Sequence, residues 1–407
     1  MKKSSVLLTI IVWFILNFSG CTTNEGSGIY PLSMAQVEEY SWIDDLNFDS
    51  LPKAIERSIE YYRQLPENEQ FDYAGYIYTA KEMIASMQLF LDIIARYQGE
   101  QRIQEIQKKF LFFETKNNDG QAFFTGYYEP ILEGSLEPTN EFQTPLYFIP
   151  DDFIVVDLGL FNEKLKGKRI RGRIKEKRFI PYDSRQEIAY ENSLQNRSKV
   201  IAYVVNDIEL FFLQIQGSGI IHLRDGSYKR VNYAAQNGHP YRAIGYLLRH
   251  KISRQEMSLQ KLKEYLYSHP DEVQDILNYN PSYTFFREVE EGPLGNIEVP
   301  LTPGRSIAMD HKLLPRGGIA FIETIYPPLT KAKREKPNSL RRFMVVQDTG
   351  GAIRGHGRAD IFWGYGAEAE KNAGHMKQKG RIFLLVARKE VFFKKNTNSL
   401  FSPQIFP

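Results

Sequence analysis

Three aspartates in the C-terminal part of the chain are the side chains best suited to chemistry: Asp310, Asp348 and Asp360. Asp348 opens a glycine-rich run, and Asp360 follows twelve residues later. A carboxyl group that keeps its proton near neutral pH acts as a general acid, and the carboxylate left behind acts as a base. The first chemistry that these residues suggest is therefore acid–base cleavage of a glycosidic bond.

Three other interpretations compete for the same residues. Residues 348–350 form the Asp-Thr-Gly triplet of aspartic proteases, but those enzymes pair two copies so that two carboxylates share a proton, and this chain has one copy. A metal site is another possibility, although the candidate ligands lack the spacing of a metal motif. An aspartate in a glycine-rich loop also commonly caps a turn, which suits Asp310 best. The candidate metal ligands are Asp310, His311, Asp348, His356 and Asp360.

Apolar segments around Asp348 and Asp360 are expected to position them. Residues 343–346 are predicted to be a buried strand, because the run is apolar and partly β-branched, and residues 381–386 are predicted to be another strand. A helix is predicted over residues 367–379, with Gly380 ending it. Both aspartates are thus expected on glycine-rich connections between strands, where catalytic groups are often carried. The glycines of these connections are Gly355, Gly357, Gly364 and Gly366.

Two more segments could face a ligand. Residues 123–130 are dense in aromatics and fit either a buried strand or a strand that presents Thr125 as a hydrogen-bond donor and a tyrosine as a platform for a sugar ring. Residues 213–219 alternate apolar and amide side chains before glycines, which predicts a strand with Gln214 and Gln216 on one face, followed by a tight turn.

The predicted secondary structure differs among the other segments of the chain. Residues 50–115 are predicted to be helical, with core packing by an amphipathic helix over residues 78–97. Short strands are expected at residues 145–149 and 153–156, and a helix over residues 233–250 that is broken at residues 237–240. Short strands separated by glycine or proline turns return after residue 284 and suggest a small barrel.

The segment of residues 164–178 is strongly basic, with nine lysines or arginines and one acid. It lacks the interleaved aromatics of a single-strand nucleic-acid binder, and the formal net charge of +3 also argues against a nucleic-acid partner. The segment is predicted to be a solvated loop or hairpin, with an acidic polymer as a conceivable neighbour.

The N-terminus has the pattern of an exported protein. Lys2 and Lys3 precede an apolar run at residues 6–18, which is shorter than a membrane span. Small residues then precede Cys21, the only cysteine, as in a bacterial lipobox. We expect cleavage before Cys21 and its acylation, with anchoring at the periplasmic face of the outer membrane. A plain signal peptide with a stray thiol is the alternative.

Several segments together resemble the membrane-bound lytic murein transglycosylase A (MltA) family. They follow the family's order and spacing over roughly residues 110–390, whereas the region before 110 and the basic segment match poorly. The matching segments are residues 124–130, 214–219, 237–245, 280–283 and 347–380.

The resemblance implies a mainly β fold with flanking helices. Its core would be a double-psi β-barrel with a second, smaller β-domain inserted and a glycan groove between the two. The implied parts are a lipoprotein signal peptide at 1–20, a tether at 21–49, the catalytic domain with its helical N-terminal part at 50–130 and 285–395, and the inserted domain with linking helices at 131–284.

The family's three characteristic aspartates match Asp310, Asp348 and Asp360. The resemblance implies that Asp360 is the single catalytic acid and base and that Asp348 supports it. The residues implied to bind the glycan are Thr125, Tyr127, Gln216 and Ser218.

The implied activity is that of a lytic transglycosylase, a lyase that cuts the β-1,4 bond between N-acetylmuramic acid and N-acetylglucosamine in peptidoglycan. The substrate's own 6-hydroxyl attacks and leaves a 1,6-anhydro end, so no second carboxylate is needed. Asp360 would need a raised pKa, through desolvation by residues 361–363 and repulsion from Asp348. No metal or organic cofactor is expected. A true hydrolase and a non-catalytic peptidoglycan-binding lipoprotein are the alternatives.

Overall fold

The segment before Asp348 forms strand β17, Ser339–Asp348, in the computed structural model, which describes residues 32–253, 255–327 and 339–392. Residues 342–347 of this strand are buried. β17 lies between β15 (Ser306–Met309), with which it is parallel, and β16 (Ile319–Ile325), with which it is antiparallel. The predicted buried strand is confirmed, and its central place in the sheet explains why it is apolar on both faces.

Six strands close into a ring in the order β19-β16-β17-β15-β18-β5, because β19 pairs with β5 as well as with β16. This ring agrees with the small barrel that the short strands suggested. Two further strands, β4 and β1, extend the sheet beyond β19. The bounds are Ala122–Glu129 for β5, Arg358–Tyr365 for β18, Lys377–Ala387 for β19, Phe110–Thr115 for β4 and Ser33–Met34 for β1.

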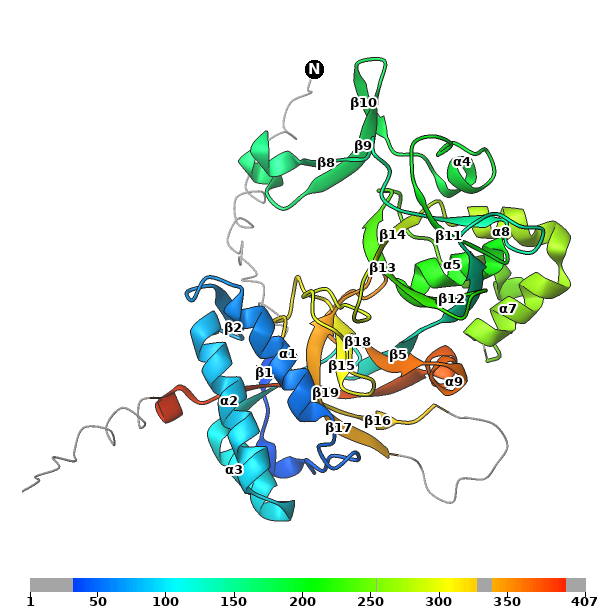
Figure 1. Ribbon diagram of the computed structural model, residues 1–407. Helices are drawn as coiled ribbons and strands as arrows, with labels where there is room; N and C mark the ends of the chain where they lie inside the picture. The colour runs from blue at the N-terminus through cyan, green and yellow to red at the C-terminus, as the bar shows by residue number, and fades with distance from the viewer. Residues whose placement is uncertain (1–31, 254, 328–338, 393–407) are drawn as a thin grey trace, which may run out of the picture. The chain divides into compact units, whose positions relative to one another are not determined.

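Helices from the N-terminal part cover the outside of this ring, with α1 beside β17 and α2 beside β19 (Figure 1). α2 begins at a capping box in which Thr79 and Glu82 satisfy each other's backbone N–H. The predicted core packing of this helix is confirmed, but residues 70–79 form a hairpin rather than helix. The bounds are Leu51–Arg63 for α1, Gln70–Tyr73 for β2, Tyr76–Thr79 for β3, Ala80–Arg96 for α2 and Gly99–Lys109 for α3.

Residues 32–49 pack against the ring, which corrects the expectation of a tether through residue 49. Trp42 is 1 % exposed and contacts Phe112 and Phe321. Nη1 and Nη2 of Arg305 donate to the Asp44 carboxylate at 2.7 and 2.9 Å, and neither side chain is exposed. The buried ion pair fixes this segment, so any tether lies before residue 32, as does Cys21, outside the described residues.

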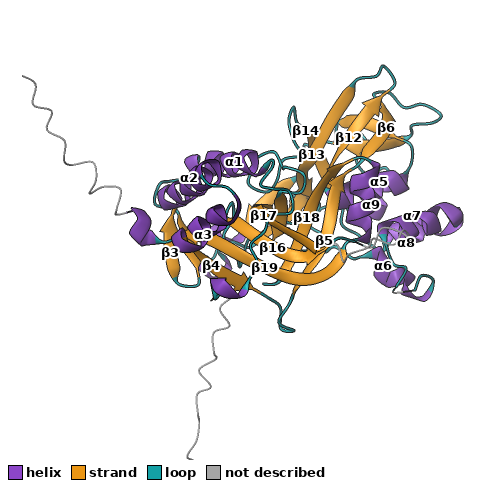
Figure 2. Cartoon of the chain, turned by 90° about the horizontal axis from the view of Figure 1, so that it is seen from below, coloured by secondary structure: helices purple, strands orange, loops and turns teal. Residues whose placement is uncertain are grey.

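A second sheet takes its strands from between β5 and β15, in the order β14-β13-β12-β6-β11-β7. β12 is parallel to β6, and the other pairings are antiparallel. Figure 2 shows this sheet beside α5. The bounds are Ile131–Ser135 for β6, Thr144–Tyr147 for β7, Val200–Val204 for β11, Ser218–Leu223 for β12, Tyr228–Gln236 for β13 and Thr284–Glu288 for β14.

Helix α5 (Asp207–Gln216) lies between this sheet and the linking helices, so it is buried on two sides. Residues 213–216 are therefore helical, which corrects the predicted strand, although Gly217 makes the predicted turn at φ 82°. The helix predicted over residues 233–250 is also wrong in its first part, because residues 233–236 belong to β13. The linking helices are α4 (Arg185–Ala189), α6 (Ile244–Leu247), α7 (Leu259–Ser268) and α8 (Val273–Asn278).

The basic segment forms part of a separate three-stranded sheet of β8 (Ile154–Asp157), β9 (Arg169–Lys175) and β10 (Arg178–Pro181). The hairpin prediction for this segment is confirmed. We call residues 131–288 the second region, and in Figure 1 the three-stranded sheet projects from the rest of it.

The helix after the aspartates is shorter than predicted. α9 covers Ala367–His375, and residues from Lys377 pair with β5 instead of continuing the helix. Gly380 therefore lies inside β19, where a Cβ would overlap the carbonyl oxygen of Glu323, and it is not a helix end. Among the described residues, no helix is long and apolar enough to cross a bilayer.

Candidate active site

Asp348 and Asp360 approach each other because they flank the same residue of β15. Ala308 pairs with Asp348 on the parallel side and with Asp360 on the antiparallel side. Strands lie about 4.8 Å apart, so the two aspartate Cα atoms are separated by two strand spacings, roughly 10 Å. The ring thus brings together two of the three predicted aspartates.

Asp360 lies within β18, not on a connecting loop as expected. Its Oδ1 accepts a short hydrogen bond from Thr125 Oγ1 and lies 2.9 Å from Arg358 Nη1. Arg358 also donates to Thr125 Oγ1 at 2.6 Å, so the three side chains form a triangle. The Asp360 side chain is 18 % exposed, so it is partly open to solvent.

Asp348 ends β17 and is held by three donors. Its Oδ1 accepts from the backbone N–H of Thr349 at 2.8 Å and of Asn296 at 3.0 Å. Its Oδ2 accepts from the hydroxyl of Tyr127 at 2.9 Å. These donors fix both oxygens, so Asp348 is oriented more firmly than Asp360.

Burial disfavours the charged form of both aspartates. It raises the pKa of Asp348 to about 6, against the hydrogen bonds from Thr349, Tyr127 and Asn296, while the charge of Asp360 adds to the rise. Burial also raises the pKa of Asp360, although Arg358 and Thr125 act in the opposite direction. The expected desolvation is therefore present, with Ile361 and Phe362 buried beside Asp360. At neutral pH, Asp348 is mainly ionised.

Asp310 has a different role in the structure. It is 3 % exposed, and its carboxylate accepts from the backbone N–H of Lys312 at 3.2 Å and of Gly355 at 3.0 Å. These contacts tie the turn after β15 to the glycine-rich loop. Within the described ranges, no group of three or more histidine, cysteine, aspartate or glutamate side chains is arranged to hold a metal ion.

Of the other predicted residues, Thr125 and Tyr127 of β5 contact the two aspartates directly. Gln216 instead accepts from the backbone N–H of Tyr128 at 3.1 Å and thereby joins α5 to β5. Ser218 is 5 % exposed at the start of β12, opposite Asn232. The structure thus groups Thr125 and Tyr127 with the aspartates, and it places Gln216 and Ser218 in the second region.

A buried ion pair lies where the chain passes between the two sheets. Glu129, the last residue of β5, has a fully buried side chain, and its Oε2 lies 3.3 Å from Arg230 Nη1 on β13. Arg230 also donates to the carbonyl of Gly292, in the segment that returns to the ring. Arg230 therefore contacts both chain segments that connect the ring to the second sheet. Burial raises the pKa of Glu129 to about 7, against the charge of Arg230.

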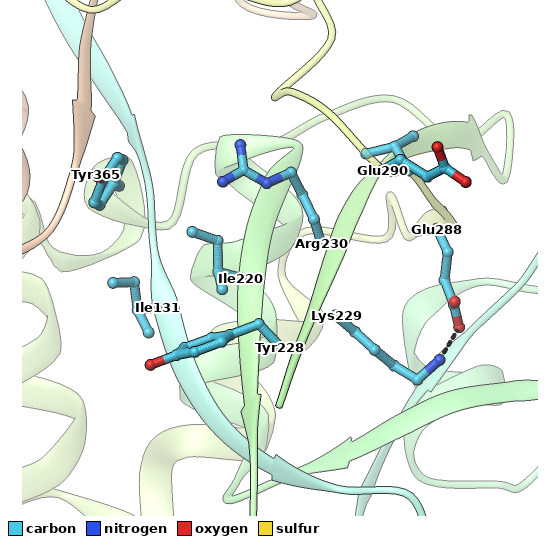
Figure 3. A pocket seen from close by; sticks show the side chains of 9 residues that line it. Ile131, Ile220, Tyr228, Lys229, Arg230, Glu288, Glu290 and Tyr365 are labelled. Carbon is cyan, nitrogen blue, oxygen red and sulfur yellow. Dashed lines mark hydrogen bonds and ion pairs between the residues drawn. The ribbon is translucent and has the colours of Figure 1, made fainter. Parts of the chain in front are cut away.

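A pocket of about 680 Å³ opens beside this ion pair (Figure 3). Tyr228 and Tyr365 are 63 % and 62 % exposed, and Lys229 donates to Glu288 at 2.7 Å. Neither Asp348 nor Asp360 lines it. The lining residues are Ile131, Ile220, Tyr228, Lys229, Arg230, Glu288, Val289, Glu290 and Tyr365.

Sequence reasoning missed Arg358, Glu129 and Arg230. Arg358 had a signal, because residues two apart in a strand share a face and Arg358 precedes Asp360 by two. Glu129 and Arg230 lie far apart in the sequence, and only the tertiary fold pairs them.

Two family models match the chain. Residues 123–287 match the MltA specific insert domain, and residues 305–386 match the 3D domain. The chain is 33 % identical over 277 residues to membrane-bound lytic murein transglycosylase A of Escherichia coli strain K12, covering 67 % of each protein. It is 30 % identical over 275 residues to the protein of that name from Vibrio cholerae, covering 66 % of each.

Solved structures agree with these relatives. A membrane-bound lytic murein transglycosylase from Agrobacterium tumefaciens has a TM-score of 0.74 and 29 % identity, covering 90 % of this chain and 99 % of that one. E. coli MltA with bound chitohexaose has a TM-score of 0.66 and 25 % identity, covering 88 % and 94 %. On the sequence relatives and the shared fold together, the chain belongs to the membrane-bound lytic murein transglycosylase A family.

Proposed function

We propose that this protein is a peptidoglycan lytic transglycosylase that uses Asp360 as acid and then as base. It cleaves the β-1,4 bond between N-acetylmuramic acid and N-acetylglucosamine and leaves a 1,6-anhydromuramoyl end. The observation that carries the assignment is the partly exposed Asp360 side chain, whose carboxyl pKa is raised by burial, in a chain whose relatives bear this enzyme's name.

The geometry favours Asp360 over Asp348 as the proton carrier. Three donors occupy both oxygens of Asp348 and favour its ionised form. Thr125 and Arg358 both contact Oδ1 of Asp360, so we assign the transferred proton to Oδ2.

The reaction then proceeds by two proton transfers at one residue. Protonated Asp360 gives its proton to the glycosidic oxygen as the bond to C1 of the muramic acid breaks, which releases the N-acetylglucosamine side with a free hydroxyl. The Asp360 carboxylate next removes the proton from the 6-hydroxyl of the same muramic acid as that oxygen bonds to C1. Asp360 ends protonated, and no water is consumed. Because the attack is intramolecular, positioning the sugar supplies much of the rate.

Asp348 supports the charge that develops at C1. An ionised carboxylate near an oxocarbenium-like transition state stabilises it electrostatically. Tyr127 and the two backbone N–H groups hold Asp348 in place and keep it ionised at neutral pH. We assign Tyr127 and Thr125 as positioning residues for the two carboxyl groups.

We further infer that the glycan lies between the ring and the second sheet. Tyr365 is five residues from Asp360 on β18, roughly 17 Å along the strand. With Tyr228 it offers exposed aromatic faces of the kind on which sugars stack, which supports a glycan path from Asp360 towards the pocket of Figure 3. Gln216 and Ser218 are proposed as further groove residues on the second region.

We also infer the domain organisation that the family resemblance suggested. The six-stranded ring would be a double-psi β-barrel, formed with its helices by residues 50–130 and 285–395. Residues 131–284 would form the inserted domain, which is supported by the origin of the second sheet's described strands in residues 131–288. The signal peptide at 1–20 and lipid-modified Cys21 would hold the protein at the periplasmic face of the outer membrane.

The test is digestion of purified peptidoglycan by the chain from Thr22 onward, beside Asp360→Asn and Asp348→Asn variants, with mass spectrometry of the products. We expect anhydro-muropeptides, lighter by one water than hydrolytic products, from the unmodified protein. Asp360→Asn should lower the rate at least roughly 1,000-fold, and Asp348→Asn should slow formation of the same products. Retained turnover by Asp360→Asn, with loss only in Asp348→Asn, would reverse the two roles. Binding of both variants without any turnover by the unmodified protein would leave only a glycan-binding lipoprotein.

A further inference from the structure

The sheet of β8, β9 and β10 has two faces of different chemistry. β9 alternates, so that Arg169, Arg171, Arg173 and Lys175 share one face. The registers of β8 and β10 against β9 gather apolar side chains on the opposite face. We call residues 154–181 the arm. The apolar face of the arm consists of Ile154, Val156, Ile170, Ile174 and Phe179.

The apolar face of the arm is open to solvent. Ile170 and Ile174 are 43 % and 55 % exposed. Leu160 and Phe161, in the tip loop of residues 158–168 between β8 and β9, are 86 % and 78 % exposed. Within the part of the chain that the structure describes, none of these four side chains belongs to an apolar core cluster. Exposed apolar side chains gathered in one place commonly mark an interaction surface.

Cations lie on the opposite face of the arm and in its loops. Residues 164–178 hold nine lysines or arginines, and three of these pair with acids: Arg169 with Asp157, Arg173 with Asp183 and Arg178 with Glu176. The other six form no ion pair with any described residue. Lys164, Lys166 and Lys168 are exposed in the tip loop beside Leu160 and Phe161.

This combination fits an anionic phospholipid surface. Apolar side chains enter the boundary between headgroups and acyl chains, while lysines beside them contact the phosphates. The carboxylates of peptidoglycan would satisfy the cations but offer no apolar layer for Leu160 and Phe161. An acylated Cys21 would keep Leu32 within roughly 40 Å of a bilayer, because only eleven residue steps separate the two residues. That last point rests on the proposed lipid anchor.

We propose that the arm is a second membrane contact, in which Leu160 and Phe161 enter the headgroup region of an anionic bilayer and Lys164, Lys166 and Lys168 bind its phosphates. The contact is reversible and does not depend on acylation of Cys21. With the anchor, it would give the protein two attachments to the membrane, and two weak attachments together hold far longer than either alone.

Vesicle binding by the unacylated chain tests this. The full mature chain with Cys21→Ser is mixed with vesicles of phosphatidylethanolamine containing phosphatidylglycerol, or of phosphatidylcholine alone, and bound protein is measured by co-sedimentation at low and high salt. A Leu160→Ser/Phe161→Ser variant is matched by Ile43→Ser/Leu136→Ser, whose side chains are 63 % and 52 % exposed. A Lys164→Gln/Lys166→Gln/Lys168→Gln variant is matched by Lys53→Gln/Lys81→Gln/Lys108→Gln, which also removes three exposed cations.

We expect binding to the anionic vesicles that weakens with salt and on phosphatidylcholine. The lysine variant should bind roughly 100-fold more weakly and the apolar variant at least about tenfold more weakly, while both matched controls bind normally. No binding to the anionic vesicles, or equal binding by arm and control variants, would overturn the proposal.

Two other outcomes would also overturn the proposal by assigning the arm elsewhere. If the arm variants lose retention on purified peptidoglycan but keep vesicle binding, the occupant is the cell-wall polymer. If they instead abolish a dimer seen by light scattering and keep vesicle binding, the occupant is a second copy of the chain. Cleavage of soluble glycan by the arm variants should stay normal, so a failure of this proposal is distinguishable from failure of the proposed catalytic function.

Discussion

At the scale of single residues, the two carboxyl groups of the site differ in the number and placement of their hydrogen-bond donors. Asp348 receives three hydrogen bonds on both oxygens, and Asp360 is contacted on one oxygen by Thr125 and Arg358. Both lie in surroundings that disfavour charge. In the proposed mechanism, Asp360 donates and recovers one proton while Asp348 stays ionised.

The variant Thr125→Val tests whether the Thr125 hydroxyl lowers the pKa of Asp360 and positions its carboxyl group. The hydroxyl of Thr125 stabilises the charged form of Asp360, so removing it should raise the pKa of that carboxyl further. The alkaline limb of the pH–rate profile should move to higher pH, and the rate near neutral pH should fall roughly tenfold from lost positioning. Thr125→Ser keeps the hydroxyl and should restore the profile. An unchanged alkaline limb in Thr125→Val would show that Thr125 does not act through Asp360.

The variant Tyr127→Phe tests whether the Tyr127 hydroxyl lowers the pKa of Asp348. In the unmodified protein, the hydrogen bond from Tyr127 lowers the pKa of Asp348. The variant lacks this bond, so the pKa of Asp348 should rise above about 6. Asp348 would then lose its charge at higher pH, and the acidic limb of the pH–rate profile should move upward with kcat reduced roughly tenfold and KM little changed. Tyr128→Phe is the control, because Tyr128 packs against Ala369 and Ala373 on α9. Equal effects of both substitutions would contradict this role for Tyr127.

At the scale of secondary-structure elements, the site depends on β15, which places β17 and β18 on either side of Ala308. The second region is attached through Arg230 of β13, which contacts both the outgoing Glu129 and the returning Gly292. Asn232, two residues along β13, also exchanges hydrogen bonds with the backbone of Leu294 at 2.8 and 3.1 Å. One strand of the second sheet thus holds both connections to the ring.

The variant Glu129→Gln tests how the buried Glu129 affects the pH dependence of the free energy of unfolding. The folded pKa of Glu129, about 7, is above its usual value of 4.5. Between these two pH values the folded state binds more protons, so the free energy of unfolding falls as pH rises, by on the order of 3 kcal/mol. Urea denaturation below pH 4.5 and above pH 7 should show that Glu129→Gln gains stability relative to the unmodified protein at the higher pH. Glu137→Gln, at an exposed position, should show no such gain, and a parallel pH dependence of the unmodified and Glu129→Gln proteins would contradict the prediction.

Elements with a clear pattern of their own were predictable, and those shaped by their neighbours were not. α2 has an apolar face and β17 is a buried apolar run, so both were predicted. α5 is buried against the sheet on one side and helices on the other, which removes the helical periodicity that the sequence would otherwise show. α9 ends at His375 because β5 pairs with the next residues, and no local signal in the sequence reports that pairing.

The site was predictable to the extent that its residues belong to recognisable segments. Asp348 and Asp360 follow from the glycine-rich run, and Thr125 from the aromatic segment. Asp348 also accepts hydrogen bonds from Tyr127 and from the backbone of Asn296, which are both distant from it in the sequence. The sequence alone does not reveal these contacts. The burial that raises the two pKa values is likewise a property of the assembled ring.

At the scale of the whole molecule, the N-terminal segment closes the outside of the ring through buried charge. The carboxylate of Asp44 accepts from Nη1 and Nη2 of Arg305 and from the backbone N–H of Phe343 at 2.8 Å. It also accepts from the backbone N–H groups of Leu46 and Phe48, each at 3.0 Å. Because every oxygen is used, the cost of burying the charge is offset by its partners.

Asp44→Ala should strongly destabilise the protein, since it leaves Arg305 buried without a counter-charge. We expect a loss of roughly 3–5 kcal/mol in the free energy of unfolding, measured by urea denaturation. Asp119→Ala removes an exposed carboxylate that pairs with Lys379 at 2.8 Å and should change stability little. Similar losses in both variants would mean that the buried ion pair does not anchor residues 32–49 as described.

The most direct test of the central claim is digestion of peptidoglycan in water enriched in ¹⁸O, followed by mass spectrometry of the new glycan ends. If Asp360 acts alone and the 6-hydroxyl of the substrate attacks C1, the new ends are anhydro sugars and carry no ¹⁸O. If a water molecule is the nucleophile, each cut leaves a reducing end that carries one ¹⁸O, with a correction for slow exchange measured on free sugar. The account predicts the first result, and the second would contradict it.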